Sequence, residues 1–211
     1  SVTTLALLLL ALPATASWLE NDANPVFSPP GGASWPTVVH DAAQFPGAGP
    51  PAAWKMWFNR AEGPTAAPAP PTSPDGRTWT EISGDLGLTP GLEAPRVVHD
   101  PNRFGEGPSG PLYKMWVSDR TAAIASIRLL ESEDGLSWTD RGLVIDGFVE
   151  FDHLWNLSVA YRPLAGGGSP TDSVYLGFAG KGSTVTFYSS PDGETWTQEQ
   201  ALTLDAHHPA P

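Results

Sequence analysis

One tight-turn motif that occurs three times limits the possible folds of this chain more than any other feature. The motif is a serine, a variable residue, an Asp-Gly pair and then a tryptophan, and it spans Ser73–Trp79, Ser132–Trp138 and Ser190–Trp196. Its aspartates are 59 and 58 residues apart. Two other segments, Pro-x-Val-Val-His-Asp at residues 36 and 95 and Lys-Met-Trp at residues 55 and 114, recur at a spacing of 59. Three marks with one period indicate a structural repeat.

Each repeat unit contains short runs of β-branched and aromatic residues separated by Gly, Pro and Asp, which is typical of antiparallel strands. In the second unit we expect strands at 96–99, 112–117, 124–130 and 137–145. In the first unit the third strand falls on the proline-rich stretch 66–71. Proline cannot donate to a strand ladder, so this strand should be distorted or lie at an edge.

Four antiparallel strands that repeat at this spacing predict an all-β fold made of β-propeller blades. We place the blades at about 24–88, 89–147 and 148–205. Three blades do not close a ring, so we expect a truncated propeller whose remaining blades are not in this sequence. After a last strand at 201–204, the tail 205–211 could begin the inner strand of a fourth blade. The alternative is a complete three-unit protein that closes by oligomerising.

Composition excludes several classes of partner and site. The 11 basic and 23 acidic residues give a net charge of −12, which argues against a nucleic-acid partner because phosphate binding needs a basic patch. The absence of cysteine excludes disulfides, thiolate metal sites and a cysteine nucleophile. We find no metal-ligand spacing and no phosphate-cradling loop, so we predict no metal and no cofactor.

The first 16 residues have the pattern of a secretory signal peptide. The apolar run Leu5–Leu12 has eight residues, whereas a membrane span needs about 20. Ala14-Thr15-Ala16 follows it as an A-x-A cleavage site. We therefore expect a signal peptide at 1–16, a partial propeller at 17–211, secretion to the extracellular space or periplasm, and no membrane span.

The Asp-Gly turn resembles a known family motif. It is similar to the Asp-box of sialidase propellers but has one residue fewer between Asp and Trp. Together with the strand Tyr113-Lys-Met-Trp116, it more closely resembles the five-bladed propellers of the superfamily of glycoside hydrolase families 43 and 32. The resemblance covers residues 24–205 and implies the fold more strongly than the activity.

The residues that precede each expected inner strand should meet at one rim of the propeller axis. Asp22, Glu93 and Asp152 come from three different units there. Glycoside hydrolysis needs two carboxyl groups, one that donates a proton and one that attacks or activates water. A third carboxylate can raise the pKa of the donor. These three residues are therefore the candidate catalytic groups.

The same rim offers candidate substrate contacts. Trp35 and Trp155 could stack on sugar rings, and Arg96 could bind a hydroxyl or carboxylate where the first unit has a threonine. His153 and Asn156 belong to the same segment as Asp152 and complete the predicted substrate-binding set.

The resemblance also implies roles for two of the carboxylates. Glu93-Ala94-Pro95 is similar to the Glu-Gly-Pro or Glu-Cys-Pro element that carries the general acid in these families. The segment 18–24 loosely resembles the family-32 Trp-x-Asn-Asp-Pro-Asn element, which would make Asp22 the nucleophile or base, although this chain has an extra residue and lacks the proline. The families run Asp, Asp, Glu along successive blades, whereas Glu93 here precedes Asp152.

These features predict a secreted carbohydrate-active protein that hydrolyses glycosidic bonds in an oligo- or polysaccharide. The first alternative is a non-catalytic propeller that binds glycans or a protein. The second is a sialidase-like protein, which would need an arginine cluster to bind the sialic carboxylate. Only Arg60, Arg96 and Arg162 are placed to point inward.

Overall fold

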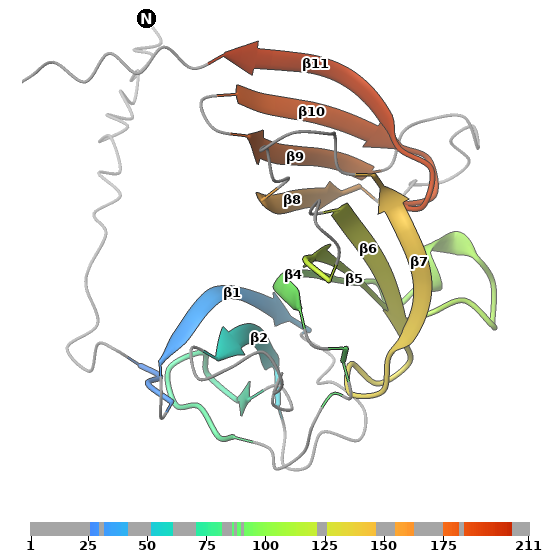
Figure 1. Ribbon diagram of the computed structural model, residues 1–211. Helices are drawn as coiled ribbons and strands as arrows, with labels where there is room; N and C mark the ends of the chain where they lie inside the picture. Colours follow the sequence, from blue (N-terminus) through green and yellow to red (C-terminus); the bar gives the residue numbers. More distant parts are fainter. Residues whose placement is uncertain are drawn as a thin grey trace, which may run out of the picture.

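The computed structural model describes residues 26–29, 32–41, 52–60, 71–81, 86, 88–89, 91–121, 126–146, 155–162, 175–181 and 184–203. These residues form three separate antiparallel sheets, which we call blades 1 to 3 (Figure 1). Blade 1 contains β1 (Ala33–His40), β2 (Trp54–Arg60) and β3 (Thr72–Ser73). Blade 2 contains β4 (Leu92–His99), β5 (Tyr113–Asp119), β6 (Ser126–Ser132) and β7 (Thr139–Ile145). Blade 3 contains β8 (Trp155–Tyr161), β9 (Tyr175–Lys181), β10 (Thr184–Ser190) and β11 (Thr197–Thr203).

Within each blade the strands follow one another in chain order as an antiparallel meander. The first strands are the inner ones, because β4 contacts β1 on one side and β8 on the other. The described helical structure consists of a single 3₁₀ turn, Arg103–Gly105. This arrangement confirms the predicted all-β fold with propeller blades. None of the described helical structure is long and apolar enough to cross a membrane.

Two of the predicted strands, 66–71 and 201–204, are described only in part. The predicted strand 201–204 corresponds to the end of β11, which pairs with β10 and is the outermost strand of blade 3. The tail 205–211, which could begin a fourth blade, lies outside the described residues. The third strand of blade 1 is reduced to β3, whose two residues pair with Trp54 and Lys55. Pro71, which precedes β3, contributes its carbonyl as the acceptor for the Met56 N–H, which agrees with a proline that cannot donate. The rest of the proline-rich stretch lies outside the described residues.

The three Asp-Gly turns have one hydrogen-bonding scheme. In blade 2, Ser132 Oγ accepts the Gly135 N–H at 2.8 Å, and Asp134 Oδ1 accepts the N–H groups of Leu136 and Ser137 at 2.7 and 2.8 Å. The glycine has a φ of +73°, which a residue with a Cβ adopts only with strain. Blades 1 and 3 repeat these bonds. The turn motif is therefore structural, since its polar groups satisfy the local backbone.

The Lys-Met-Trp motif joins each blade to the turn of the next. In the first joint, between blades 1 and 2, Lys55 Nζ donates to the Asp134 carbonyl at 2.8 Å and Trp57 Nε1 donates to the Gly135 carbonyl at 3.2 Å. In the second joint, between blades 2 and 3, Lys114 and Trp116 make the same bonds to Asp192 and Gly193, each shorter than 3.0 Å. The repeat of 59 residues therefore preserves a contact between blades.

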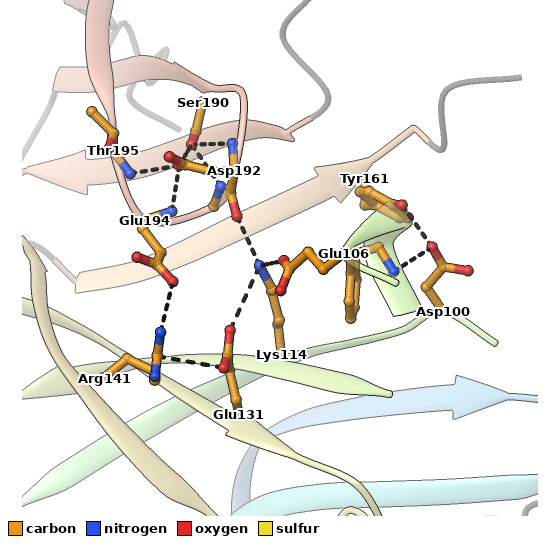
Figure 2. Close-up of polar contacts among 12 residues, drawn as sticks. Asp100, Glu106, Lys114, Glu131, Arg141, Tyr161, Ser190, Asp192, Glu194 and Thr195 are labelled. Atoms are coloured by element: carbon orange, nitrogen blue, oxygen red, sulfur yellow. Dashed lines mark hydrogen bonds and ion pairs between the residues drawn. The ribbon is translucent and has the colours of Figure 1, made fainter. Parts of the chain in front are cut away.

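In the second joint, carboxylates surround the buried Lys114 (Figure 2). Lys114 Nζ lies 2.6 Å from Glu106 and 3.7 Å from Glu131, and its side chain is 1% exposed. Arg141 extends the network by pairing with Glu131 and Glu194. Burial raises the pKa of the Glu131 carboxyl although both cations oppose this shift. Apolar side chains fill each joint around these polar contacts, so the cores lie between blades.

Candidate active site

Each inner strand is interrupted by a β-bulge near its first residues. The regular pairing of β1 with β2 shifts between Ser34 and Thr37, that of β4 with β5 between Glu93 and Arg96, and that of β8 with β9 between Trp155 and Ser158. Since the inner strands are neighbours with the same topology, the three bulges lie at the same end of the blades. This end is the rim that the sequence predicted for the site.

The bulges have a left-handed residue followed by proline in the first two blades. Trp35 has a φ of +49° and Ala94 a φ of +52°, which is uncommon for residues that carry a Cβ. Pro36 and Pro95 follow them. Because proline has no N–H to donate to the neighbouring strand, a bulge, where the pairing is interrupted, accommodates it. Bulges of this kind redirect side chains and occur often beside active sites.

Glu93 stands at the edge of the β4 bulge, directly opposite Ser118 on β5. Its carboxylate forms an ion pair with Arg120, whose Nη1 lies 3.3 and 3.2 Å from the two oxygens. The side chains of Glu93 and Arg120 are 26% and 42% exposed, so solvent and a ligand can reach both. The carboxyl group would have to leave the arginine before it could donate a proton to a substrate.

Arg96 follows the same bulge and is half-buried. Its Nη1 donates to the Pro95 carbonyl at 3.0 Å, and no described carboxylate lies within ion-pair distance of it. Burial lowers the pKa of its guanidinium. Arg96 follows Glu93 across the bulge of β4, and donors that no described carboxylate occupies suit contacts to substrate oxygens.

The structure therefore brings four of the predicted residues to one end of the inner strands. Trp35, Glu93, Trp155 and Asn156 lie at or beside the bulges, although only the backbone of the last two is described. Asp22, Asp152 and His153 lie outside the described residues, so their positions remain predictions. In the described part of the chain, no three His, Cys, Asp or Glu side chains are grouped as a metal site would require.

Sequence reasoning missed three residues near Glu93. Arg120 pairs with its carboxylate, Ser118 lies opposite it, and Asn59 bonds to the backbone of the bulge. The repeat could have pointed to two of these residues, because Asn59 and Ser118 are 59 residues apart and so occupy equivalent positions. The residue opposite Glu93 depends on the register between β4 and β5, which the pattern of residues in the sequence does not specify.

A hollow of about 410 Å³ lies beside the Asp-Gly turn of blade 2, away from the bulges. It is lined by polar side chains, among them Glu131, Glu133 and Arg141, with no aromatic residue. Most of its charged groups already pair within the protein. Its lining offers no aromatic surface for stacking, so the bulged rim is the better candidate for a sugar site.

Comparison with known proteins supports the fold. No family model and no curated protein matches the sequence. A fructofuranosidase from Schwanniomyces occidentalis, solved with fructosylnystose, is similar in structure with a TM-score of 0.59 and 15% identity over 84% of this chain. This likeness shows that the three sheets have the fold of β-propeller blades. A structure from the GH130 family of mannoside phosphorylases, which contains glycoside hydrolases that target β-1,2 mannosidic linkages in Candida mannan, gives a TM-score of 0.61 and 16% identity over 91% of this chain.

The blade fold shared with these solved structures agrees with the resemblance noted from the turn and the Tyr-Lys-Met-Trp strand. The chain covers 35% of the fructofuranosidase and 62% of the GH130 structure. It therefore spans about one third to three fifths of the length of these structures. At these identities the likeness concerns the fold, and the activity has to be argued from the site.

Proposed function

We propose that this chain belongs to a secreted carbohydrate-active protein that hydrolyses glycosidic bonds at the bulged rim of its inner strands. The observation that carries the proposal is the position of Glu93 at the β4 bulge, where its side chain is exposed enough to meet a ligand and the half-buried Arg96 follows on the other side of the bulge. The likeness in fold to solved glycoside hydrolases supports the proposal. Glycoside hydrolysis needs two carboxyl groups that flank the scissile bond, and Glu93 would be one of them.

In this proposal Glu93 is the general acid that protonates the leaving oxygen of the sugar. Asp22 is the base or nucleophile, and Asp152 is a third carboxylate that tunes the donor. Trp35, with Trp155, offers apolar surface to a sugar ring, while Arg96, His153 and Asn156 contact its hydroxyl groups. A substrate that displaces Arg120 from Glu93 would free the carboxyl group for proton transfer.

One observation favours a second candidate function. Both oxygens of Glu93 are within hydrogen-bond distance of Arg120, and such a pair can serve as a fixed polar contact. The second candidate is therefore a propeller that binds glycans at the same rim without cleaving them.

The test uses the chemistry of a general acid. Unactivated oligosaccharides need protonation of the leaving oxygen, whereas nitrophenyl glycosides with good leaving groups need it much less. We expect Glu93→Gln to lower kcat on the oligosaccharide by about 10²–10⁴-fold and to affect the activated glycoside far less, with an unchanged Tm. Equal activity of this variant and the wild type on both substrates would contradict the role of Glu93.

The chain provides a matched control. Glu133 also forms a two-oxygen pair with an arginine, Arg103, at 2.8 and 2.9 Å, but it lies at the turn of blade 2. Glu133→Gln should leave both substrates unaffected. Glycan binding by a wild-type protein that cleaves neither substrate would favour the second candidate function.

A further inference from the structure

The bulge that carries Glu93 leaves a backbone donor without a partner in its own sheet. Between Glu93 and Arg96 the pairing of β4 with β5 is interrupted, so Ala94 and Pro95 lie outside the ladder. Proline has no N–H, which makes the amide of Ala94 the one donor within the bulge. Ala94 is only 2% exposed, so water is not a ready substitute.

The partner of this amide comes from the neighbouring blade. Asn59, the next-to-last residue of β2, accepts the Ala94 N–H with its side-chain oxygen at 3.0 Å. Buried backbone donors are almost always paired, and here a side chain of blade 1 meets that need in blade 2. The bond holds the left-handed residue directly after Glu93.

The next joint shows that this contact is not a general property of the repeat. Ser118 occupies the same place in blade 2, since it pairs with Glu93 as Asn59 pairs with Ser34. Its hydroxyl is buried and has no hydrogen-bond partner. Among the described residues, the second strand of blade 1 therefore bonds to the following bulge through Asn59, whereas the second strand of blade 2 makes no such bond through Ser118.

We infer that Asn59 is a positioning residue for Glu93, an inference that rests on the proposed function. By fixing the Ala94 amide, Asn59 sets the direction in which the adjacent carboxyl group leaves the strand. Without this acceptor the amide needs another partner, so the bulge shifts and Glu93 moves with it. A displacement of about 1 Å at a reacting group can lower a rate by about 10²-fold.

The test is Asn59→Ser in the full chain, with Asn59→Asp as the rescue. Serine is already tolerated at the corresponding position, 118, so the first variant should fold. We expect Asn59→Ser to lower kcat on the oligosaccharide by about tenfold or more, with KM within about twofold. Asn59→Asp keeps an acceptor oxygen and should retain most of the wild-type kcat. Amide hydrogen exchange at Ala94 should be faster in Asn59→Ser and near normal in Asn59→Asp.

A matched control removes another bond between blades. Tyr161 donates its hydroxyl to Asp100 at 2.7 Å at the opposite end of the inner strands, so Tyr161→Phe should leave kcat unchanged. An unchanged kcat in Asn59→Ser, with an active wild type, would overturn the role of Asn59 alone. A wild type without turnover would contradict the proposed function itself, and with it this role.

Discussion

Lys55 has its ammonium group buried in the joint between blades 1 and 2. Its side chain is 2% exposed, and its ammonium group has the Asp134 carbonyl at 2.8 Å and the Tyr113 hydroxyl at 3.3 Å as partners. Burial lowers its pKa from 10.5 to about 8, although Asp134 and Asp41 oppose this shift. Lys114, at the same place in the next joint, has Glu106 at 2.6 Å. The two lysines therefore lie in different surroundings.

This difference predicts how stability depends on pH. Between pH 8 and 10 the unfolded chain binds more protons at Lys55 than the folded chain, so the free energy of unfolding should rise with pH by about 1–2 kcal/mol. Below pH 8 this contribution is lost. The rise should end near pH 10, because burial raises the pKa of Tyr113 and unfolding then releases its proton.

Urea unfolding at a series of pH values tests this prediction. Lys55→Met should remove the rise between pH 8 and 10, whereas Lys114→Met should keep it. The same rise in both variants would show that Lys55 does not cause it.

At the scale of the element, the three turns differ in what their glycines face. A Cβ on Gly193 would lie 2.9 Å from a ring carbon of Trp116, and one on Gly135 would lie 3.0 Å from Trp57. A Cβ on Gly76 would have its nearest neighbour, in Trp54, at 3.4 Å. All three have φ between +73° and +81°, so the backbone strain of a substitution is the same.

We expect Gly76→Ala to destabilise the protein by about 1–2 kcal/mol, which is the cost of the left-handed conformation. Gly135→Ala and Gly193→Ala should cost about 1–3 kcal/mol more, because a buried tryptophan must also move. Denaturant midpoints of the three variants give the comparison. Equal losses in all three would argue against a close contact between the turn and the preceding blade.

The elements also show which parts of the fold could be predicted. The turns and the second strands were predictable because Asp-Gly pairs and the Lys-Met-Trp motif have strong local preferences. The outermost strand, β11, begins at Thr197, before the predicted stretch 201–204, and its start was missed because all seven of its residues are exposed, which removes the usual alternation of apolar and polar residues. The positive φ of Ala94 has no sequence signature, since alanine rarely adopts it.

For the site, the sequence identified the acidic residue on β4 but not its surroundings. Glu93 was found because the repeat places it before an inner strand. Its contact with Arg120 and the bond from Asn59 to Ala94 depend on strand register and on how neighbouring blades pack. Neither is encoded in a local pattern.

At the scale of the whole molecule, stability depends on the joints between blades. Met115 is fully buried in the first joint, in one cluster with Trp57 of blade 1. Met115→Ala should therefore cost about 2–5 kcal/mol, whereas Leu143→Ala, at a residue 50% exposed, should cost less than about 0.5 kcal/mol. Thermal unfolding measures both, and a small effect of Met115→Ala would contradict a core shared between blades.

The central claim is that the bulged rim of the inner strands binds and cleaves a glycan. The most direct test is a crystal structure of Glu93→Gln with the oligosaccharide that the wild-type chain cleaves. We predict a sugar ring against Trp35 and the glycosidic oxygen about 3 Å from the side chain of residue 93. A sugar in the polar hollow beside Arg141, with the bulged rim empty, would contradict the claim.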